Sequence, residues 1–141
     1  MRGVWLAIVA AVAAAWVSTA VDVRAQGASR APGGNPTAAA VKNPVNATPD
    51  SISKGRSSYD KACKNCHGQQ GLGDGPFAPK DPPPANLVDA EWTYGSSDGE
   101  IFDVIANGVG GNSKMKGFRS SMTASDMWNV VNYIRSLGPK Q

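Results

Sequence analysis

Histidine and cysteine are scarce in this chain of 141 residues, which contains one histidine, His67, and two cysteines, Cys63 and Cys66. A structural zinc site needs four ligands, and no fourth cysteine or histidine exists to complete one. A basic cluster interleaved with aromatic residues is also absent, so the sequence gives no reason to expect a nucleic-acid partner. No convincing alternation of apolar and polar residues marks a β-strand, and the fold class is therefore predicted to be all-α.

The three scarce residues fall within one short motif, Cys63-Lys64-Asn65-Cys66-His67. On a helical turn, positions i, i+3 and i+4 share one face, so both sulfurs can reach the vinyl groups of one porphyrin while the imidazole points at its iron. Cys-x-x-Cys-His is the attachment motif of c-type haem. A structural disulfide or a redox-active dithiol would have no need of the histidine. The motif therefore predicts one covalent haem c, with His67 as the proximal iron ligand.

The N-terminal segment, residues 1–25, has the pattern of a secretory signal peptide. Met1-Arg2-Gly3 is a basic start, and a largely apolar run from 4 to 21 follows it. Val23-Arg24-Ala25 offers small residues at positions −3 and −1 of a cleavage site, which predicts a cut after Ala25. Export agrees with haem attachment, which takes place outside the cytoplasmic membrane, so we predict a periplasmic protein. An uncleaved membrane anchor is the alternative, because the run is near the lower limit for spanning, and membrane association is expected only in that case.

Two further stretches follow the predicted signal peptide. Residues 26–50 are rich in alanine, proline, glycine and asparagine and show no sustained periodicity, which is typical of a flexible linker. Residues 51–141 are predicted to form one small domain. A chain of about 90 residues has a poor surface-to-volume ratio and needs help to bury enough apolar area. A haem, as a large, flat and apolar body, supplies that help.

Three amphipathic segments predict the helices of this domain. Gly55 inside the first costs up to about 1 kcal/mol relative to alanine, so we expect the close approach of another helix as compensation. The glycine-rich and proline-rich stretch between the first two helices is expected to wrap one edge of the haem. The helices are expected over about 52–66, from the capping box Ser97-Asp98-Gly99-Glu100 to Asn107-Gly108, and from Thr123-Ala124-Ser125-Asp126 to Gly138-Pro139.

The second axial position of the iron needs a ligand other than histidine, because His67 is the only one. Met127 lies on the apolar stripe of the third predicted helix, where core packing is expected. Met122 precedes the N-cap of that helix, where it is expected to pack as in a hydrophobic staple. Met115 lies in an irregular stretch, and a loop can deliver a side chain to the iron. Met115 is therefore the predicted distal ligand, with Met122 and an open or lysine-ligated iron as alternatives.

Together these residues resemble the small monohaem cytochromes c of class I, especially the bacterial soluble ones, over about 51–137. Gly55 and Tyr59 match the helix-crossing glycine and aromatic residue of that family, and Tyr133-Ile134-Arg135 looks like part of its C-terminal helix. Met115-x-x-Phe118 matches the ligand motif of the family. The resemblance implies a small cytochrome c fold, with about three to five helices wrapped around one covalently bound haem.

The resemblance also implies two details of the site. A backbone carbonyl from the Pro76 region would accept a hydrogen bond from the second nitrogen of His67 and so fix its orientation. Members of the family usually have proline after the ligand methionine, whereas this chain has Lys116. A Met115–iron bond that breaks more easily at alkaline pH is therefore expected, with Lys114 or Lys116 as the replacement ligand.

Histidine and thioether ligation together favour ferrous iron and raise the reduction potential. With both axial positions filled, the iron has no place for oxygen or peroxide, so the predicted function is electron transfer between redox protein partners and not catalysis. A dedicated cytochrome subunit of a dehydrogenase or oxidase is the first alternative. A haem sensor or enzyme with a labile distal ligand is the second, although a peroxidase would need a distal histidine that the chain does not contain.

Several basic residues lie near the haem-binding segments in sequence. They could form a cationic rim around the thioether edge of the porphyrin and steer an acidic redox partner towards it. Ordinary solvated side chains are the alternative. The residues are Lys64, Lys80, Lys114, Lys116 and Arg119.

Overall fold

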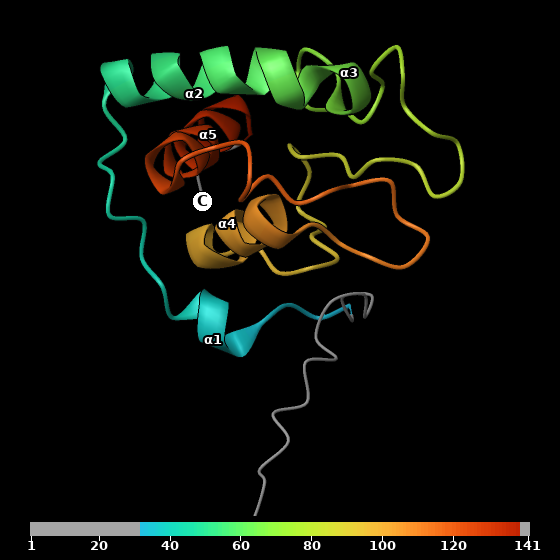
Figure 1. Ribbon diagram of the computed structural model, residues 1–141, viewed down its shortest axis with the longest axis horizontal. Helices are drawn as coiled ribbons and strands as arrows, with labels where there is room; N and C mark the ends of the chain where they lie inside the picture. The colour runs from blue at the N-terminus through green and yellow to red at the C-terminus, as the bar shows by residue number, and fades with distance from the viewer. Residues whose placement is uncertain (1–31, 139–141) are drawn as a thin grey trace, which may run out of the picture.

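The computed structural model of this protein describes residues 32–138, which contain five helices and one isolated β-bridge (Figure 1). The prediction of an all-α fold is confirmed. Within this range no helix has the length and apolar character needed to cross a bilayer. The predicted signal peptide, residues 1–25, lies outside the described residues. The helices are α1 (Pro36–Ala39), α2 (Pro49–Ala62), α3 (Lys64–His67), α4 (Asp98–Asn107) and α5 (Ala124–Leu137).

The ends of α4 and α5 follow the capping signals in the sequence. At the start of α4, the Glu100 N–H donates to Ser97 Oγ at 3.3 Å, and the Ser97 N–H donates to the Glu100 carboxylate at 3.0 Å. Thr123 and Asp126 form the same reciprocal pair at the start of α5. Each pair satisfies two backbone donors that the helix itself leaves unpaired, so the predicted bounds of both helices are confirmed.

The first predicted helix differs from the observed one at both ends. α2 begins at Pro49, with Thr48 as its N-cap, about three residues before the expected start. Proline is favoured at the first helical position, because its missing N–H would be unpaired there in any case. The helix then breaks at Cys63, and a separate single turn, α3, carries the end of the haem motif.

α2 and α5 cross at Gly55. A Cβ atom on Gly55 would lie 1.9 Å from the carbonyl oxygen of Asn129, so only glycine allows the two backbones to come this close. One turn further along α2, the rings of Tyr59 and Tyr133 meet edge to face with centroids 5.1 Å apart. The close approach expected at Gly55 is therefore confirmed.

The core lies between α2, α4 and α5. Phe102 of α4 stacks on Trp128 of α5 with ring centroids 4.0 Å apart. The side chain of Met127 is only 2% exposed, which confirms its predicted role in the core, and Met122 packs against the edge of the same cluster. Neither of these two methionines lines the cleft described below.

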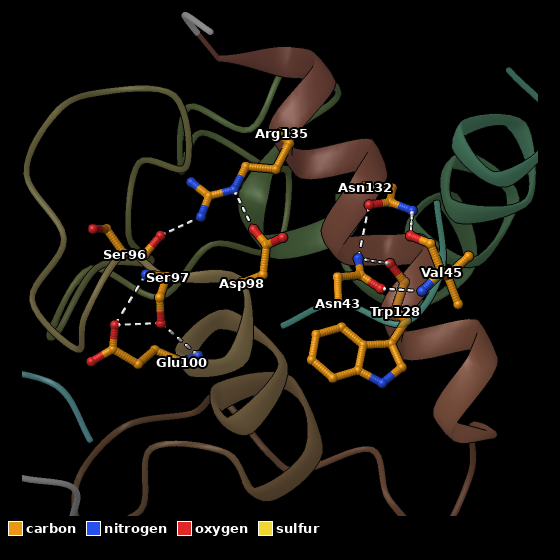
Figure 2. A network of polar contacts seen from close by, with 9 residues as sticks. All are labelled: Asn43, Val45, Ser96, Ser97, Asp98, Glu100, Trp128, Asn132 and Arg135. Carbon is orange, nitrogen blue, oxygen red and sulfur yellow. Dashed lines mark hydrogen bonds and ion pairs between the residues drawn. The ribbon is translucent and has the colours of Figure 1, made fainter. Parts of the chain in front are cut away.

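Residues 33–48, which we call the strap, pack along the domain instead of forming a flexible linker. Asn43 Nδ2 donates to Asn132 Oδ1 of α5 at 2.8 Å and to the Trp128 carbonyl at 3.3 Å, and Asn132 Nδ2 donates to the Val45 carbonyl at 3.0 Å (Figure 2). The prediction of a flexible linker over 26–50 therefore does not hold for the strap, while residues 26–31 lie outside the described range. Asparagine side chains make these contacts without any periodic apolar pattern, and for that reason neither composition nor periodicity indicated that the strap packs on the domain.

The N-terminal end of the strap lies on α4. The backbone N–H of Asn35 donates to the Glu100 carboxylate at 3.0 Å, and Asn35 Nδ2 donates to the Asp103 carboxylate at 3.0 Å. A Cβ atom on Gly99 would lie 2.0 Å from the Ala38 carbonyl oxygen, so this glycine admits α1 against α4. Hydrogen bonds to Glu100, foremost that from the backbone of Ser97, hold the pKa of its carboxyl below the ordinary value.

Arg135 of α5 holds the loop that precedes α4. Its Nε donates to Asp98 Oδ1 at 2.8 Å, and its guanidinium also donates to the carbonyl of Ser96 (Figure 2). The same guanidinium lies 5.9 Å from the centroid of the Trp92 ring. The loop that carries Trp92 and Thr93 is therefore tied to the C-terminal helix.

Candidate functional site

The predicted haem motif forms one helical turn. Cys63 is the N-cap of α3, and its carbonyl accepts hydrogen bonds from the N–H groups of Cys66 at 3.1 Å and His67 at 2.9 Å. The spacing of three and four residues therefore has the helical geometry that the sequence predicted. Both cysteines are free thiols, and burial raises the pKa of the Cys63 thiol to about 12, with a further contribution from Cys66. Cys63 is therefore an uncharged thiol at neutral pH in this fold.

Two neighbouring and mostly apolar cavities lie beside this turn, and we call them together the cleft. Their volumes are about 80 Å³ and about 500 Å³, and their walls share His67, Met115, Thr93 and Tyr94. Cys63 lines the smaller cavity and Cys66 the larger. The larger volume lies within the range of about 300–1,000 Å³ that is typical of small-molecule and cofactor sites. The structure thus brings four of the predicted site residues to one cleft.

The imidazole of His67 is oriented by Ala85 and not by the Pro76 region. Its Nδ1 lies 3.1 Å from the carbonyl oxygen of Ala85. The residues on either side of Pro76 donate their own N–H groups to carbonyls of the α3 turn, which holds that segment along the turn, and Pro76 itself is exposed. The expected carbonyl partner is corrected accordingly: the chain returns to the imidazole nine residues later, after the prolines at 82–84.

This hydrogen bond decides which nitrogen of His67 is available to a metal. A carbonyl oxygen can only accept, so Nδ1 carries the proton and Nε2 keeps its lone pair. Burial lowers the pKa of His67, and the hydrogen bond to Ala85 opposes this only in part. The imidazole is therefore held neutral and oriented, which is the state required of an iron ligand.

Met115 lies in a segment that is fastened to the C-terminal end of α4. Its carbonyl accepts from the Val109 N–H at 3.2 Å, and its N–H donates to Ser113 Oγ at 3.1 Å. The N–H groups of Phe118 and Arg119 donate to the carbonyls of Ile105 and Ala106 at 2.9 and 3.2 Å. These bonds pair the last carbonyls of α4, which the helix leaves open. The segment is thus held by backbone hydrogen bonds to the end of α4.

Two residues of the site were missed from the sequence. Ala85 had no signal, because any residue can offer a carbonyl. Trp92 lines the smaller cavity, and its Nε1 is buried with no hydrogen-bond partner in the described part of the chain. A buried indole N–H beside the cleft fits the carboxylate of a haem propionate. Tyr59, in contrast, was singled out from the sequence, and its hydroxyl donates to the Gly68 carbonyl at 2.8 Å, next to His67.

The chemistry of the cleft fits a covalent haem. It offers two free thiols, an imidazole with a free Nε2, a thioether and an unpaired N–H donor around a mostly apolar space. A porphyrin needs this combination, because its ring is apolar, its vinyl groups react with thiols and its iron takes nitrogen and sulfur ligands.

Comparison with known proteins agrees with this chemistry. Residues 50–134 match the family model described as cytochrome c oxidase, cbb3-type, subunit III. The cbb3-type cytochrome c oxidase subunit FixP of Azorhizobium caulinodans is 34% identical over 88 residues, which cover 62% of this chain and 28% of the relative. The FixP subunit of Sinorhizobium medicae is 30% identical over 93 residues, which cover 61% of this chain and 30% of that relative. This chain therefore spans less than a third of the length of these curated relatives.

Two solved structures support the same relationship. The reducing HAO-like protein complex Kustc0457/Kustc0458 of Kuenenia stuttgartiensis contains a chain that is similar with a TM-score of 0.62 and 27% identity, over 70% of this chain and 50% of that one. Cytochrome cL of Methylophaga aminisulfidivorans is similar with a TM-score of 0.51 and 26% identity, over 62% of this chain and 53% of that one. The predicted small cytochrome c fold is confirmed.

The family match covers more than half of the chain, and the family binds covalent haem c and transfers electrons. The predicted cofactor, covalent haem c, is confirmed by this relationship. The chain belongs to the c-type cytochromes, in the family of cbb3-type cytochrome c oxidase subunit III.

Proposed function

We propose that this protein carries one electron at a time on a haem ligated by His67 and Met115, in the periplasm, between redox protein partners. The observation that supports it is the placement of both side chains on the walls of both cavities, next to the two cysteines of the attachment motif. The haem, when bound, supplies the one-electron chemistry, and the protein supplies its ligands and surroundings. Release after Ala25 is part of the proposal, and the intact mass of the holoprotein tests it.

The residues of the chain have separate tasks in this proposal. Cys63 and Cys66 hold the haem covalently, and the Ala85 carbonyl keeps Nε2 of His67 directed at the iron. The backbone bonds from Met115 and Phe118 to the end of α4 keep the thioether in place. Thioether ligation stabilises ferrous iron, so a raised reduction potential is expected.

The optical spectrum of the purified holoprotein tests this function. We expect a low-spin spectrum in both oxidation states, with a weak near-infrared sulfur-to-iron band when oxidised, and only slow binding of carbon monoxide to the reduced protein at neutral pH, limited by opening of the Met115–iron bond. With both axial positions filled, the iron has no free coordination position for carbon monoxide. A high-spin spectrum or ready carbon monoxide binding would favour the sensor or enzyme alternative.

The surface next to the attachment motif supports an acidic redox partner. Lys114 and Lys116 line the same cavity as Cys66. The carbonyl of Phe77 lies 3.8 Å from Cys66 Sγ, and the Phe77 side chain is 73% exposed. An exposed aromatic ring with lysines nearby is suited to a small, transient interface in which charge steers the encounter.

The salt dependence of electron transfer tests the cationic rim. We expect the rate of reduction by an acidic redox protein to fall steeply as salt is added, because screening weakens long-range attraction. The double variant Lys114→Gln/Lys116→Gln should lower the low-salt rate by about tenfold and flatten the salt response. Lys54→Gln is the matched control, since Lys54 lies near the start of α2 and pairs with Asp50 at 2.7 Å. A flat salt response of the unchanged protein would rule out the rim.

A second proposal is that the protein serves as a subunit of a larger redox complex. The FixP relatives are named as oxidase subunits, and the Kuenenia chain comes from a protein complex. Affinity purification of the tagged holoprotein under mild conditions tests this. Recovery of a stoichiometric oxidase or dehydrogenase would favour the subunit, and recovery of the cytochrome alone would favour the free carrier.

A further inference from the structure

We infer that the strap positions the Met115 segment, through a chain of side-chain hydrogen bonds that runs from Asn35 over Asp103 and Asn107 to Arg119. This inference rests on the proposed ligation of the iron by Met115. It assigns a role to residues 33–48, which lie before the part of the chain that matches the cytochrome family.

The chain of hydrogen bonds is continuous across the surface of α4. The Asp103 carboxylate accepts from Asn35 Nδ2 at 3.0 Å and from Asn107 Nδ2 at 2.6 Å. Asn107 Oδ1 then accepts from Nε and Nη2 of Arg119, each at 3.3 Å. A carboxylate only accepts and a guanidinium only donates, so the amide of Asn107 can join them in one orientation only. Each member therefore restricts the next.

Arg119 connects this series of hydrogen bonds to the proposed iron ligand. It lies four residues after Met115, and its backbone N–H donates to the Ala106 carbonyl at 3.2 Å. A Cβ atom on Gly117 would lie 2.6 Å from the oxygen of the same Ala106, so the segment lies directly on the end of α4. Bonds at the side chain and at the backbone of Arg119 thus fasten the segment to two successive residues of α4.

The strap links the two halves of the site. Its C-terminal end leads into α2, which is followed by the turn with His67, and Asn43 binds it to α5. Its N-terminal end binds α4, which holds Met115, through Asn35. Figure 1 shows the strap running from the start of α2 to α1 beside α4. Its release would therefore leave the Met115 half less firmly held against the His67 half.

The test compares Asn35→Ala, Arg119→Gln and the double variant as holoproteins. The first readout is the rate of carbon monoxide binding to the reduced protein, which reports transient opening of the Met115–iron bond. The second is amide hydrogen exchange at Val109 and Phe118, whose N–H groups bind Met115 and Ile105. Asn35→Ala removes the bond to Asp103 and the N-cap bonds of α1, and Arg119→Gln removes the two guanidinium bonds to Asn107. Each single variant should speed both processes by about three- to fivefold, as expected for the loss of a few weak hydrogen bonds near the surface. Ser57→Ala, which removes an exposed bond within α2 at 3.1 Å, is the control and should change neither.

The double variant separates a connected chain from two local effects. If the hydrogen bonds act as one connected series, the double variant should accelerate exchange no more than the larger single variant does. The second substitution would then remove a hydrogen bond that no longer restricts the Met115 segment. Multiplicative effects, unchanged rates, or an equal acceleration in Ser57→Ala would overturn the inference. Amide exchange tests whether the strap positions the Met115 segment, even if Met115 is not the iron ligand. The sulfur-to-iron band of the unchanged protein tests separately whether Met115 binds the iron.

Discussion

Met115→Ala should leave the haem iron without its distal protein ligand. We expect the near-infrared sulfur-to-iron band to disappear, the reduced protein to bind carbon monoxide at neutral pH, and the reduction potential to fall. The alanine side chain has no donor atom, and loss of the thioether removes the soft ligand that favours ferrous iron. Absorption spectra with and without carbon monoxide, together with a redox titration, measure all three effects.

Two other methionines serve as matched controls for this result. Met127→Leu keeps the volume of a side chain that is 2% exposed in the core, so the band should remain, at a stability cost below about 1.5 kcal/mol. Met122→Ala should also retain the band, because Met122 packs at the edge of the core and lines neither cavity. If Met122→Ala loses the band and Met115→Ala keeps it, the ligand assignment is wrong.

Gly55→Ala should destabilise the folded protein by about 3 kcal/mol, although alanine is the better helix former. The new Cβ would lie 1.9 Å from the carbonyl oxygen of Asn129 and 2.9 Å from Tyr133 Cβ. Both obstacles belong to α5, and a backbone carbonyl cannot rotate aside as a flexible side chain can. α2 and α5 would have to separate, and the buried packing of Tyr59 would loosen with them.

Denaturant unfolding of the oxidised holoprotein measures this cost. The midpoint should fall while the dependence of the free energy on denaturant stays the same, since a similar surface is exposed on unfolding. Ser57→Ala on the exposed side of α2 is the control and should lie within about 0.5 kcal/mol of the unchanged protein. An equally stable Gly55→Ala would mean that the crossing of α2 and α5 is looser than the structure has it.

Local interactions explain what could be read from the sequence. The turn from Cys63 to His67 and the capping boxes at Ser97 and Thr123 join residues three or four apart. Their geometry follows from the helical backbone alone, whatever packs around it. Gly55 could also be interpreted, because a glycine inside an amphipathic helix needs a close neighbour to explain it. The helix bounds of α4 and α5 and the crossing of α2 with α5 were predicted for these reasons.

Long-range contacts explain the errors. Ala85 lies 18 residues from the imidazole that it orients, and its contribution is a backbone carbonyl, which every residue possesses. Asn43 and Asn132 are 89 residues apart, and nothing in the composition of residues 26–50 distinguishes an asparagine that is bonded to a distant helix from one in solvent. The flexible linker and the Pro76 carbonyl were expected for lack of such information.

The sequence by itself determined the cofactor and the fold class. The motif at 63–67 holds both cysteines and the only histidine of the chain, and the apolar periodicity is helical. The tertiary structure alone decided how the imidazole is oriented, how the Met115 segment is held without a proline, and that the strap belongs to the domain. Attachment chemistry depends on neighbours along the chain, whereas orientation and support depend on groups that meet only after the helices have packed.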